Sequence, residues 1–280
     1  MPSLRPLATA HRPTLTAILG EFTGTFLFLL FAFLGASITA SYASTTPPLL
    51  TLLFVALAFA LSLTANVWAF FRVTGAAFNP AVTVALFVVT PRAARSWVRS
   101  GCVIVAQLAG GIAAAAVAAG LVPGEGMPAV DTTLGGGASV AQGLFIEMFL
   151  TAELVFVILM VGVEKHKGTF MAPAAVGTAF FLTQLVGINF TGGSLNPARS
   201  LGPAVVSGRW PEYFWIYFVG PVGGGLLASG FYTLLQFLRW EECNPGQDWD
   251  DADGLDKLEE KLCISKRLHN STYMEGPEAR

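Results

Sequence analysis

The sequence predicts an all-α membrane protein with six membrane-spanning helices, two short re-entrant half-helices and an inverted internal repeat. Apolar residues make up 54% of the chain and charged residues only 12%, which is too apolar for the surface of a soluble domain. Several apolar stretches approach or exceed the ~20 residues that cross the hydrocarbon core of a bilayer. In addition, one short motif, Thr-Gly followed by two small residues, a large apolar residue and Asn-Pro-Ala, occurs twice, at 74–81 and 191–198.

Polar or charged segments separate the apolar stretches and define the order of the elements. We expect spans at about Leu15–Tyr42, Leu49–Phe71, Ser96–Leu121, Ala141–Val163, Met171–Ile188 and Tyr213–Leu238. Two further stretches, Asn79–Val89 and Asn196–Val206, are about half the length of a span. Because they cannot cross the membrane, we expect them to be re-entrant.

Basic residues gather at one end of the predicted spans. They are Arg5, Arg12, Arg72, Arg92, Arg95, Arg99, Lys165, Lys167 and Arg239. The loops at the other end, 41–48 and 122–140, contain no Lys or Arg. The positive-inside rule therefore predicts that both termini are cytoplasmic. Arg199 and Arg209 are exceptions, expected on the outer side.

The two halves of the chain are predicted to be related by inversion. Glu21-x-x-x-Thr25 opens the first half, and Glu147-x-x-x-Thr151 opens the second. Gly110-Gly111 in the third span is echoed by Gly223-Gly224-Gly225 in the sixth. Each half holds three spans, an odd number, so the second half must insert upside down. Inverted repeats place a functional site near the midplane, built from discontinuous helices.

Each copy of the motif predicts the start of a half-helix. Asn is a good N-cap, and Pro is favoured at the first helical position. The two starts are Asn79-Pro80-Ala81 and Asn196-Pro197-Ala198. If the half-helices meet tip to tip, both asparagine amides can donate a hydrogen bond to one passing molecule. The partial positive charge at each helix N-terminus disfavours a cation there.

The residues before each asparagine are expected to form an extended loop with exposed carbonyl groups, because glycine permits such a backbone. The candidate carbonyl groups belong to Gly75, Ala76, Ala77, Gly192 and Ser194. Acceptors along one wall and donors at the centre suit a small neutral solute that forms hydrogen bonds. They suit an ion poorly.

Other classes of function have little support in the sequence. The net charge of −2 indicates no nucleic-acid partner. Cys102, Cys243 and Cys263 have no regular spacing, so neither a disulfide framework nor a metal site is expected. The three histidines lie outside the predicted spans, and no nucleophile–base pair is apparent. We therefore expect neither an enzyme nor a cofactor.

The paired motifs resemble those of the aquaporins, or major intrinsic proteins. The resemblance covers about residues 15–240 and is carried by Gly-Ala-Ala-Phe-Asn-Pro-Ala-Val-Thr at 75–83 and Gly-Gly-Ser-Leu-Asn-Pro-Ala-Arg-Ser at 192–200. More weakly, residues 244–248 are similar to fungal members. The resemblance implies a right-handed bundle, a homotetramer in the lipid bilayer with one pore per subunit, and passive permeation of water without protons or ions.

The resemblance also implies an outer constriction, the selectivity filter, at Phe59, Gln184, Gly193 and Arg199. Gln184 departs from the water-selective pattern, which usually has His there. Gly193 has no side chain, so we expect a wider constriction unless another group fills the space. An Arg beside an apolar helix is costly unless it lines water or finds partners.

Glu21 and Glu147 lie inside predicted spans, where a carboxylate suggests a proton relay. The resemblance instead implies that both are buried braces, which accept hydrogen bonds from the backbone of the re-entrant loops. We expect the brace.

Several positions favour the water-channel type within the family. Ser200 stands where aquaglyceroporin-like members have Asp, and Ala204 with Tyr217-Phe218 also resembles water channels. One alternative is a wider channel of the same fold, which passes hydrogen peroxide, ammonia or small polyols such as glycerol. A secondary transporter also uses inverted repeats and broken helices, but no carboxylate flanks Asn79 or Asn196. A junction protein with a vestigial pore is a third alternative.

These expectations divide the chain into three parts. Residues 1–13 form a cytoplasmic N-terminal segment, and residues 14–240 form the aquaporin channel domain. Its first repeat covers about 14–121 and its second about 141–240. Residues 241–280 form an acidic cytoplasmic tail. The expected location is the plasma membrane.

Overall fold

The computed structural model describes residues 12–123, 130–244 and Cys263. The expected N-terminal segment and the acidic tail lie almost entirely outside these ranges. The chain separates into two compact units, 1–232 and 233–280. The first holds the helical bundle. In the second, a 3-10 helix, Trp240–Glu242, follows the end of the last long helix, and Arg239 pairs with Glu242.

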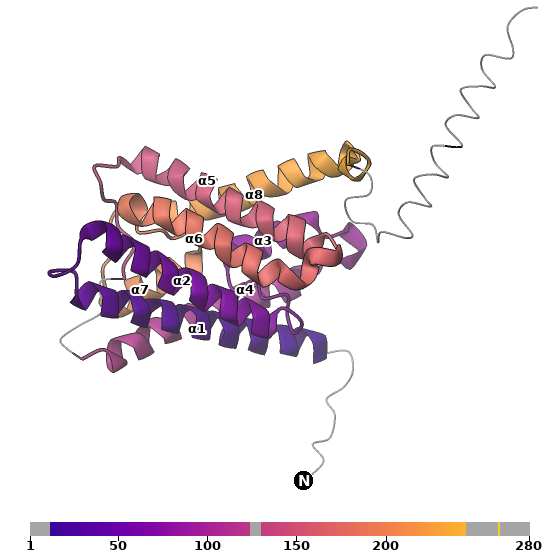
Figure 1. Ribbon diagram of the computed structural model, residues 1–280. Coiled ribbons are helices and arrows are strands. Elements are labelled where there is room, and N and C mark those ends of the chain that lie inside the picture. Colours follow the sequence, from indigo (N-terminus) through magenta and orange to yellow (C-terminus); the bar gives the residue numbers. More distant parts are fainter. Residues whose placement is uncertain (1–11, 124–129, 245–262, 264–280) are drawn as a thin grey trace, which may run out of the picture. The chain divides into compact units, whose positions relative to one another are not determined.

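Six of the described helices are long and apolar enough to cross a membrane, which confirms the predicted multi-pass, all-α architecture. Figure 1 shows these helices running side by side. They are α1 (Arg12–Ser41), α2 (Pro48–Phe70), α4 (Trp97–Leu121), α5 (Val140–Ile158), α6 (Ala172–Thr191) and α8 (Ile216–Phe237). A π-helix, Leu159–Val163, extends α5, and the 3-10 helices Arg92–Ala94 and Lys167–Met171 precede α4 and α6. The observed bounds differ from the six predicted spans by only a few residues.

Two shorter helices begin at the predicted Asn-Pro-Ala motifs. Helix α3 covers Pro80–Val89 and α7 covers Pro197–Ser207, with 10 and 11 residues respectively. At a rise of 1.5 Å per residue each is roughly 15 Å long, about half of the hydrocarbon thickness. Neither can span a bilayer.

Glycines in α4 let this helix approach two others closely. A Cβ atom added at Gly110 would lie 2.6 Å from the backbone oxygen of Phe22 in α1. One added at Gly111 would lie 2.4 Å from the backbone oxygen of Ala198 in α7. These distances are too short for real Cβ contacts, so the glycines are required for the approach.

Helix α8 repeats this arrangement in the second half of the chain. A Cβ atom added at Gly224 would lie 2.2 Å from the backbone oxygen of Met148 in α5, and one at Gly225 would lie 3.0 Å from that of Ala81 in α3. The third long helix of each half therefore packs on the first helix of its own half and on the half-helix of the other. This exchange joins the two repeats.

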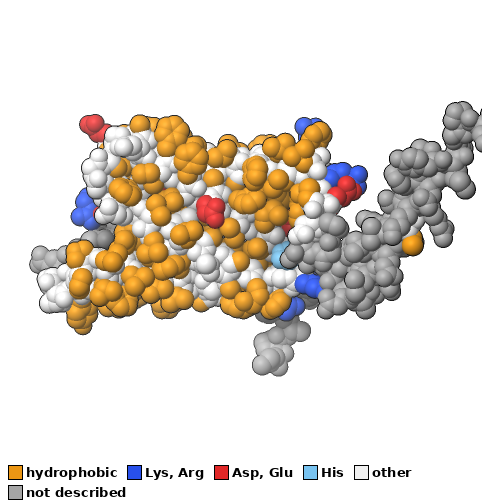
Figure 2. Space-filling view, turned by 45° about the horizontal axis from the view of Figure 1, so that its top comes forward, with side chains coloured by type: hydrophobic (Ala, Val, Ile, Leu, Met, Phe, Trp, Pro, Cys, Tyr) orange, Lys and Arg blue, Asp and Glu red, His pale blue; other side chains and the backbone are white. Residues whose placement is uncertain are grey.

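The outer surface of the bundle is apolar along its length. Figure 2 shows hydrophobic side chains over the middle of the described surface, with Lys and Arg gathered near the ends. Exposed aromatic side chains include Trp97, Phe149 and Phe31. Such a surface suits lipid contact. Glu153 in α5 is an exposed carboxylate within this region.

We predict that Gly111→Leu destabilises the bundle, whereas Gly120→Leu in the same helix does not. The added side chain at Gly111 would meet the Ala198 carbonyl, while a Cβ at Gly120 meets nothing within 4 Å. Overpacking of this kind costs about 1–3 kcal/mol or more. Thermal denaturation of the purified protein in detergent, followed by fluorescence-detected size exclusion, compares the two variants. Equal stability would contradict the packing argument.

Candidate functional site

The two half-helices start with the same cap. The Asn79 Oδ1 atom accepts a hydrogen bond of 2.9 Å from the Ala81 N–H, and the Asn196 Oδ1 atom accepts one of 2.9 Å from the Ala198 N–H. Each asparagine precedes a proline, whose missing N–H costs nothing at a helix start. The cap fixes each amide group so that its nitrogen points away from its own helix.

Those nitrogens hold the two half-helices together. Asn79 Nδ2 donates to the Leu195 carbonyl at 2.7 Å, and Asn196 Nδ2 donates to the Phe78 carbonyl at 2.9 Å. Each asparagine thus binds the residue that precedes the other asparagine, and we call this arrangement the asparagine clasp. An amide nitrogen carries two hydrogens, so each asparagine retains a second donor beyond the clasp.

The two residues whose carbonyls accept the clasp hydrogen bonds have a strained backbone conformation. Phe78 and Leu195 have φ angles of 48° and 52°, in the left-handed region that non-glycine residues rarely adopt. Such a conformation costs roughly 1–2 kcal/mol per residue. It persists only where surrounding contacts determine it, and two carboxylates supply those contacts.

Glu21 holds the first loop. Its Oε1 atom accepts from the Ala77 N–H at 3.2 Å, and its Oε2 atom accepts from the Phe78 N–H at 2.8 Å. Gln107 in α4 donates to the same Oε2 atom at 2.8 Å and also contacts Thr83 at 2.9 Å. All of these groups except the Ala77 N–H belong to buried residues. The carboxylate is therefore engaged by the loop and by a neighbouring helix.

Glu147 holds the second loop in the same way. Its Oε1 atom accepts from the Ser194 N–H at 2.9 Å and from the Thr191 hydroxyl at 2.6 Å. Its Oε2 atom accepts from the Leu195 N–H at 2.7 Å. Both carboxylates thus bond to the residue with positive φ that precedes an asparagine. The sequence analysis did not predict that Gln107 and Thr191 bind these carboxylates. Gln107 gave a signal that could have been used, because a polar amide inside an apolar span needs a partner.

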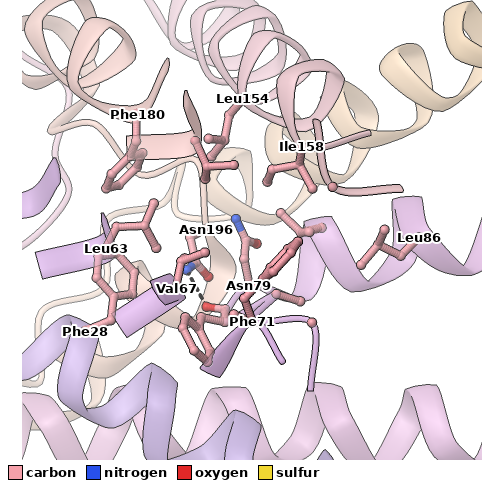
Figure 3. A pocket seen from close by; sticks show the side chains of 17 residues that line it. Phe28, Leu63, Val67, Phe71, Asn79, Leu86, Leu154, Ile158, Phe180 and Asn196 are labelled. Atoms are coloured by element: carbon pink, nitrogen blue, oxygen red, sulfur yellow. Dashed lines mark hydrogen bonds between the residues drawn. The ribbon is translucent and has the colours of Figure 1, made fainter. Parts of the chain in front are cut away.

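A cavity of about 40 Å³ opens on one side of the asparagine clasp (Figure 3). A buried water site needs roughly 10–15 Å³, so the cavity has room for more than one water molecule. Both asparagines line it, together with Gly75, Ala76 and Ala77 of the first loop. Its remaining walls are mostly apolar: Phe28, Leu63, Val67, Phe71, Phe78, Val82, Leu86, Leu154, Ile158, Gly162, Val176 and Phe180.

The predicted filter residues Arg199 and Phe59 lie together, outside the set of residues that line this cavity. The guanidinium carbon of Arg199 is 4.8 Å from the Phe59 ring centroid and 5.7 Å from that of Phe33. Arg199 Nη2 donates to the Gly192 carbonyl at 3.1 Å, and Nη1 donates to the Val130 carbonyl. The side chain is 3% exposed, and its Nε atom has no partner.

The other two predicted filter residues also meet. Gln184 Nε2 donates to the Gly193 carbonyl at 3.0 Å. A Cβ atom at Gly193 would lie 2.6 Å from Gln184 Oε1, and the φ angle of Gly193 is +63°. The amide of Gln184 therefore occupies the space that the missing side chain was expected to leave open. Gln184 Oε1 is buried and has no hydrogen-bond partner.

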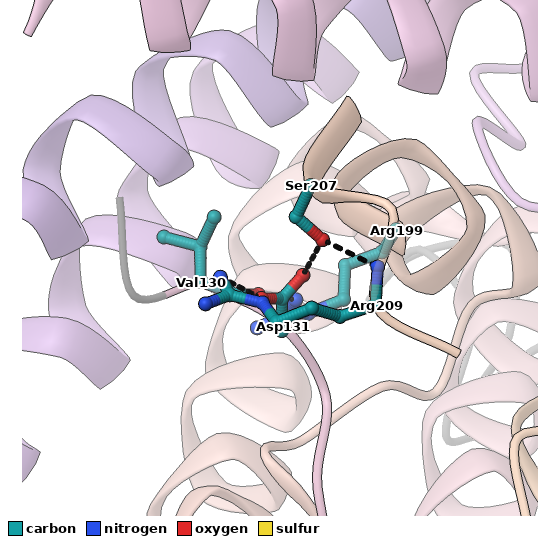
Figure 4. Close-up of polar contacts among 5 residues, drawn as sticks. All are labelled: Val130, Asp131, Arg199, Ser207 and Arg209. Atoms are coloured by element: carbon teal, nitrogen blue, oxygen red, sulfur yellow. Dashed lines mark hydrogen bonds and ion pairs between the residues drawn. The ribbon is translucent and has the colours of Figure 1, made fainter. Parts of the chain in front are cut away.

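A polar cluster fixes the loop that holds Arg199 (Figure 4). Asp131 pairs with Arg209 and accepts a hydrogen bond of 3.1 Å from the Ser207 hydroxyl. The Arg209 N–H donates to the same hydroxyl at 3.2 Å. Val130, the neighbour of Asp131, presents its carbonyl to Arg199. The sequence alone assigns no role to Asp131, because this pairing joins positions far apart in the chain.

Of the positions that favoured the water-channel type, Ser200, Ala204 and Tyr217 are buried, whereas Phe218 is half-buried. The Ser200 hydroxyl contacts the Ser194 hydroxyl at 2.6 Å, so two loop residues satisfy one another. Ala204 and Tyr217 are 2% and 0% exposed. The Tyr217 hydroxyl is buried and has no hydrogen-bond partner in the described structure.

The sequence profile described as "Major intrinsic protein" matches residues 8–232. The chain is 48% identical over 261 residues to "Aquaporin-7" of Botryotinia fuckeliana (strain B05.10), which covers 87% of this chain and 56% of that protein. It is 46% identical over 274 residues to "Probable aquaporin-5" of Gibberella zeae, covering 93% and 49% respectively. The chain thus spans about half the length of these relatives.

The fold is also similar to a solved structure. The X-ray structure of the aquaglyceroporin from Plasmodium falciparum superposes with a TM-score of 0.66, covering 78% of this chain and 95% of that one. The sequence identity is 22%. At this identity the likeness concerns the fold alone.

We predict that Glu147→Leu destabilises the protein strongly, while Glu153→Leu, at an exposed position of the same helix, does not. The first change leaves the buried N–H groups of Ser194 and Leu195 without an acceptor. Each such group costs about 1–3 kcal/mol. The yield of monodisperse protein and its melting temperature in detergent measure the difference. Comparable melting of the two variants would show that the loop does not depend on this carboxylate.

Proposed function

The chain belongs to the major intrinsic protein family, and from this premise we propose that it is a passive transmembrane water channel that excludes protons and ions. Members of this family are channels, and six apolar helices make this chain a multi-pass membrane protein. The proposal that water is the main solute rests on the arrangement of hydrogen-bonding groups around the asparagine clasp.

The observation that carries the proposal is the meeting of Asn79 and Asn196 in the lining of one small cavity. Each asparagine uses one amide hydrogen in the clasp and can donate the second to a solute in the cavity. The carbonyl groups of Gly75, Ala76 and Ala77 offer acceptors along one wall, and the other walls are apolar. A water molecule can therefore exchange partners along a single track.

Ion exclusion follows from fixed positive charge. The N-terminal ends of α3 and α7 meet at the clasp, and each carries about half a positive charge. Arg199 adds a full positive charge beside Phe59. A cation must lose its hydration in this narrow path without gaining compensating anionic groups, whereas neutral water loses far less.

Assembly and location are further parts of the proposal. We place both termini in the cytoplasm on the distribution of Lys and Arg, and we propose a homotetramer in the plasma membrane because the family resemblance implies it. The exposed apolar surface of the helices provides area for contact with lipid and with further copies.

Hydrogen peroxide is the second candidate solute, because two filter residues have polar atoms without partners. Gln184 Oε1 is an acceptor without a partner, and Arg199 Nε is a donor without a partner. A molecule that both donates and accepts can satisfy both atoms, as water and peroxide do. Glycerol passage would be slow at most, because Ser200 stands where aquaglyceroporin-like members have Asp and the cavity is narrow.

We predict that the purified protein in liposomes accelerates osmotic shrinkage well above that of empty vesicles, with a low activation energy. Water then crosses through a continuous path rather than through lipid. Stopped-flow light scattering measures the rate, and its linear dependence on the osmotic gradient distinguishes a channel from a saturable transporter. Shrinkage no faster than that of bare lipid, with folded protein present, would contradict the proposal.

We predict that Gln184→Leu lowers the ratio of peroxide to water permeability about threefold to tenfold, the factor that one net hydrogen bond of 0.5–1.5 kcal/mol provides. Leucine is one atom shorter than glutamine, and it removes both the free acceptor and the hydrogen bond to the Gly193 carbonyl. A peroxide-sensitive dye inside matched vesicles reports peroxide entry, and light scattering reports water. An unchanged ratio would show that Gln184 does not select the solute.

A further inference from the structure

We propose that Phe28 and Phe180 form a second constriction of the pore, between the filter residues and the asparagine clasp, and that this aromatic pair sets the largest solute that passes. The inference rests on the proposed channel function. It assigns the size limit to two side chains outside the filter. Both come from helices distant in sequence, α1 and α6.

The two rings meet in the wall of the cavity. Phe28 and Phe180 both line it, and their ring centroids are 5.8 Å apart at an interplanar angle of 70°. Aromatic rings with centroids 4.5–7 Å apart are in edge-to-face contact. Each side chain is only 2% exposed. The contact therefore leaves no space for a water molecule between the rings.

Phe180 lies one helical turn from the filter. It precedes Gln184 by one turn of α6, so the two side chains lie on the same face, about 6 Å apart along the axis. The Phe180 ring also meets the Phe59 ring edge-on, with centroids 6.4 Å apart. Gln184 and Phe59 do not line the cavity, whereas Phe180 does. Phe180 consequently separates the filter from the cavity.

Apart from Asn79 and Asn196, the side chains that line this cavity are apolar. Leu63 follows Phe59 by one turn of α2, and Leu154 lies on α5; both line the cavity near the aromatic pair. Figure 3 shows Phe180 and Leu154 along one side of the cavity and Phe28 along the other. A solute at this level has apolar neighbours and must push the rings apart.

The rings have limited freedom to move. Phe59, which contacts Phe180, is itself packed edge-on against Phe33 with centroids 6.1 Å apart, and lies beneath the Arg199 guanidinium. Displacement of Phe180 toward the filter is therefore resisted by buried neighbours. A small solute needs a small displacement and a larger one needs more, so the barrier depends on size and is independent of the polar groups at Gln184 and Arg199.

The test compares Phe180→Val with Phe149→Val, the same change at a lipid-exposed position of α5. We expect Phe180→Val to raise water permeability about fivefold, roughly the factor for loss of an aromatic contact, and to raise glycerol permeability about tenfold or more. Phe149→Val should change none of these rates.

Phe180→Leu retains more of the side-chain volume and should give intermediate permeabilities. If the valine variant does not fold, this leucine variant tests whether Phe180 forms the second constriction. Folded Phe180 variants with wild-type water and glycerol permeability would overturn the second constriction, while water flux through the wild type would leave the proposed function intact. Conversely, a wild type that conducts no water beside a conducting Phe180→Val variant would support the constriction and contradict the proposed function.

Discussion

Backbone that leaves the helical conformation inside a membrane needs hydrogen-bond partners from the protein, and two buried carboxylates supply them here. Glu21 and Glu147 each accept bonds from consecutive N–H groups of a loop that would otherwise have no partner. Those bonds hold Phe78 and Leu195 at positive φ, which turns their carbonyls toward the opposite half-helix. The asparagine clasp, the cavity beside it and the direction of both half-helix dipoles all depend on this support.

The helical packing places these loops at the same level. Gly111 and Gly225 let the third long helix of each half touch the half-helix of the other half. A half-helix alone buries little surface, so these contacts hold it in the bundle. The same exchange brings the two asparagines together, since each half of the chain contributes one of them.

The two loops before the asparagines have different surroundings, so the two halves of the chain are not equivalent. The first loop is supported by Gln107 and Thr83 and borders the apolar cavity. The second loop borders the filter, where Arg199 takes its partners from Gly192 and Val130. In the proposed channel a solute therefore meets a polar, positively charged site at the filter and an apolar, aromatic-walled cavity beside the clasp. We therefore propose that Arg199 selects by charge, whereas Phe28 and Phe180 select by size.

The sequence by itself determined the spans, the half-helices and the repeat, because hydrophobic length, Asn-Pro caps and odd span number are local or countable properties. It also pointed to Glu21 and Glu147 through the cost of a charge in lipid. What only the tertiary structure decided are contacts between residues distant in the chain: Gln184 filling the space beside Gly193, and the Phe28–Phe180 pair. In a chain with 22 phenylalanines, spacing cannot tell which rings face a pore and which face lipid. That choice depends on how helices rotate against one another, which the packing of the whole bundle sets.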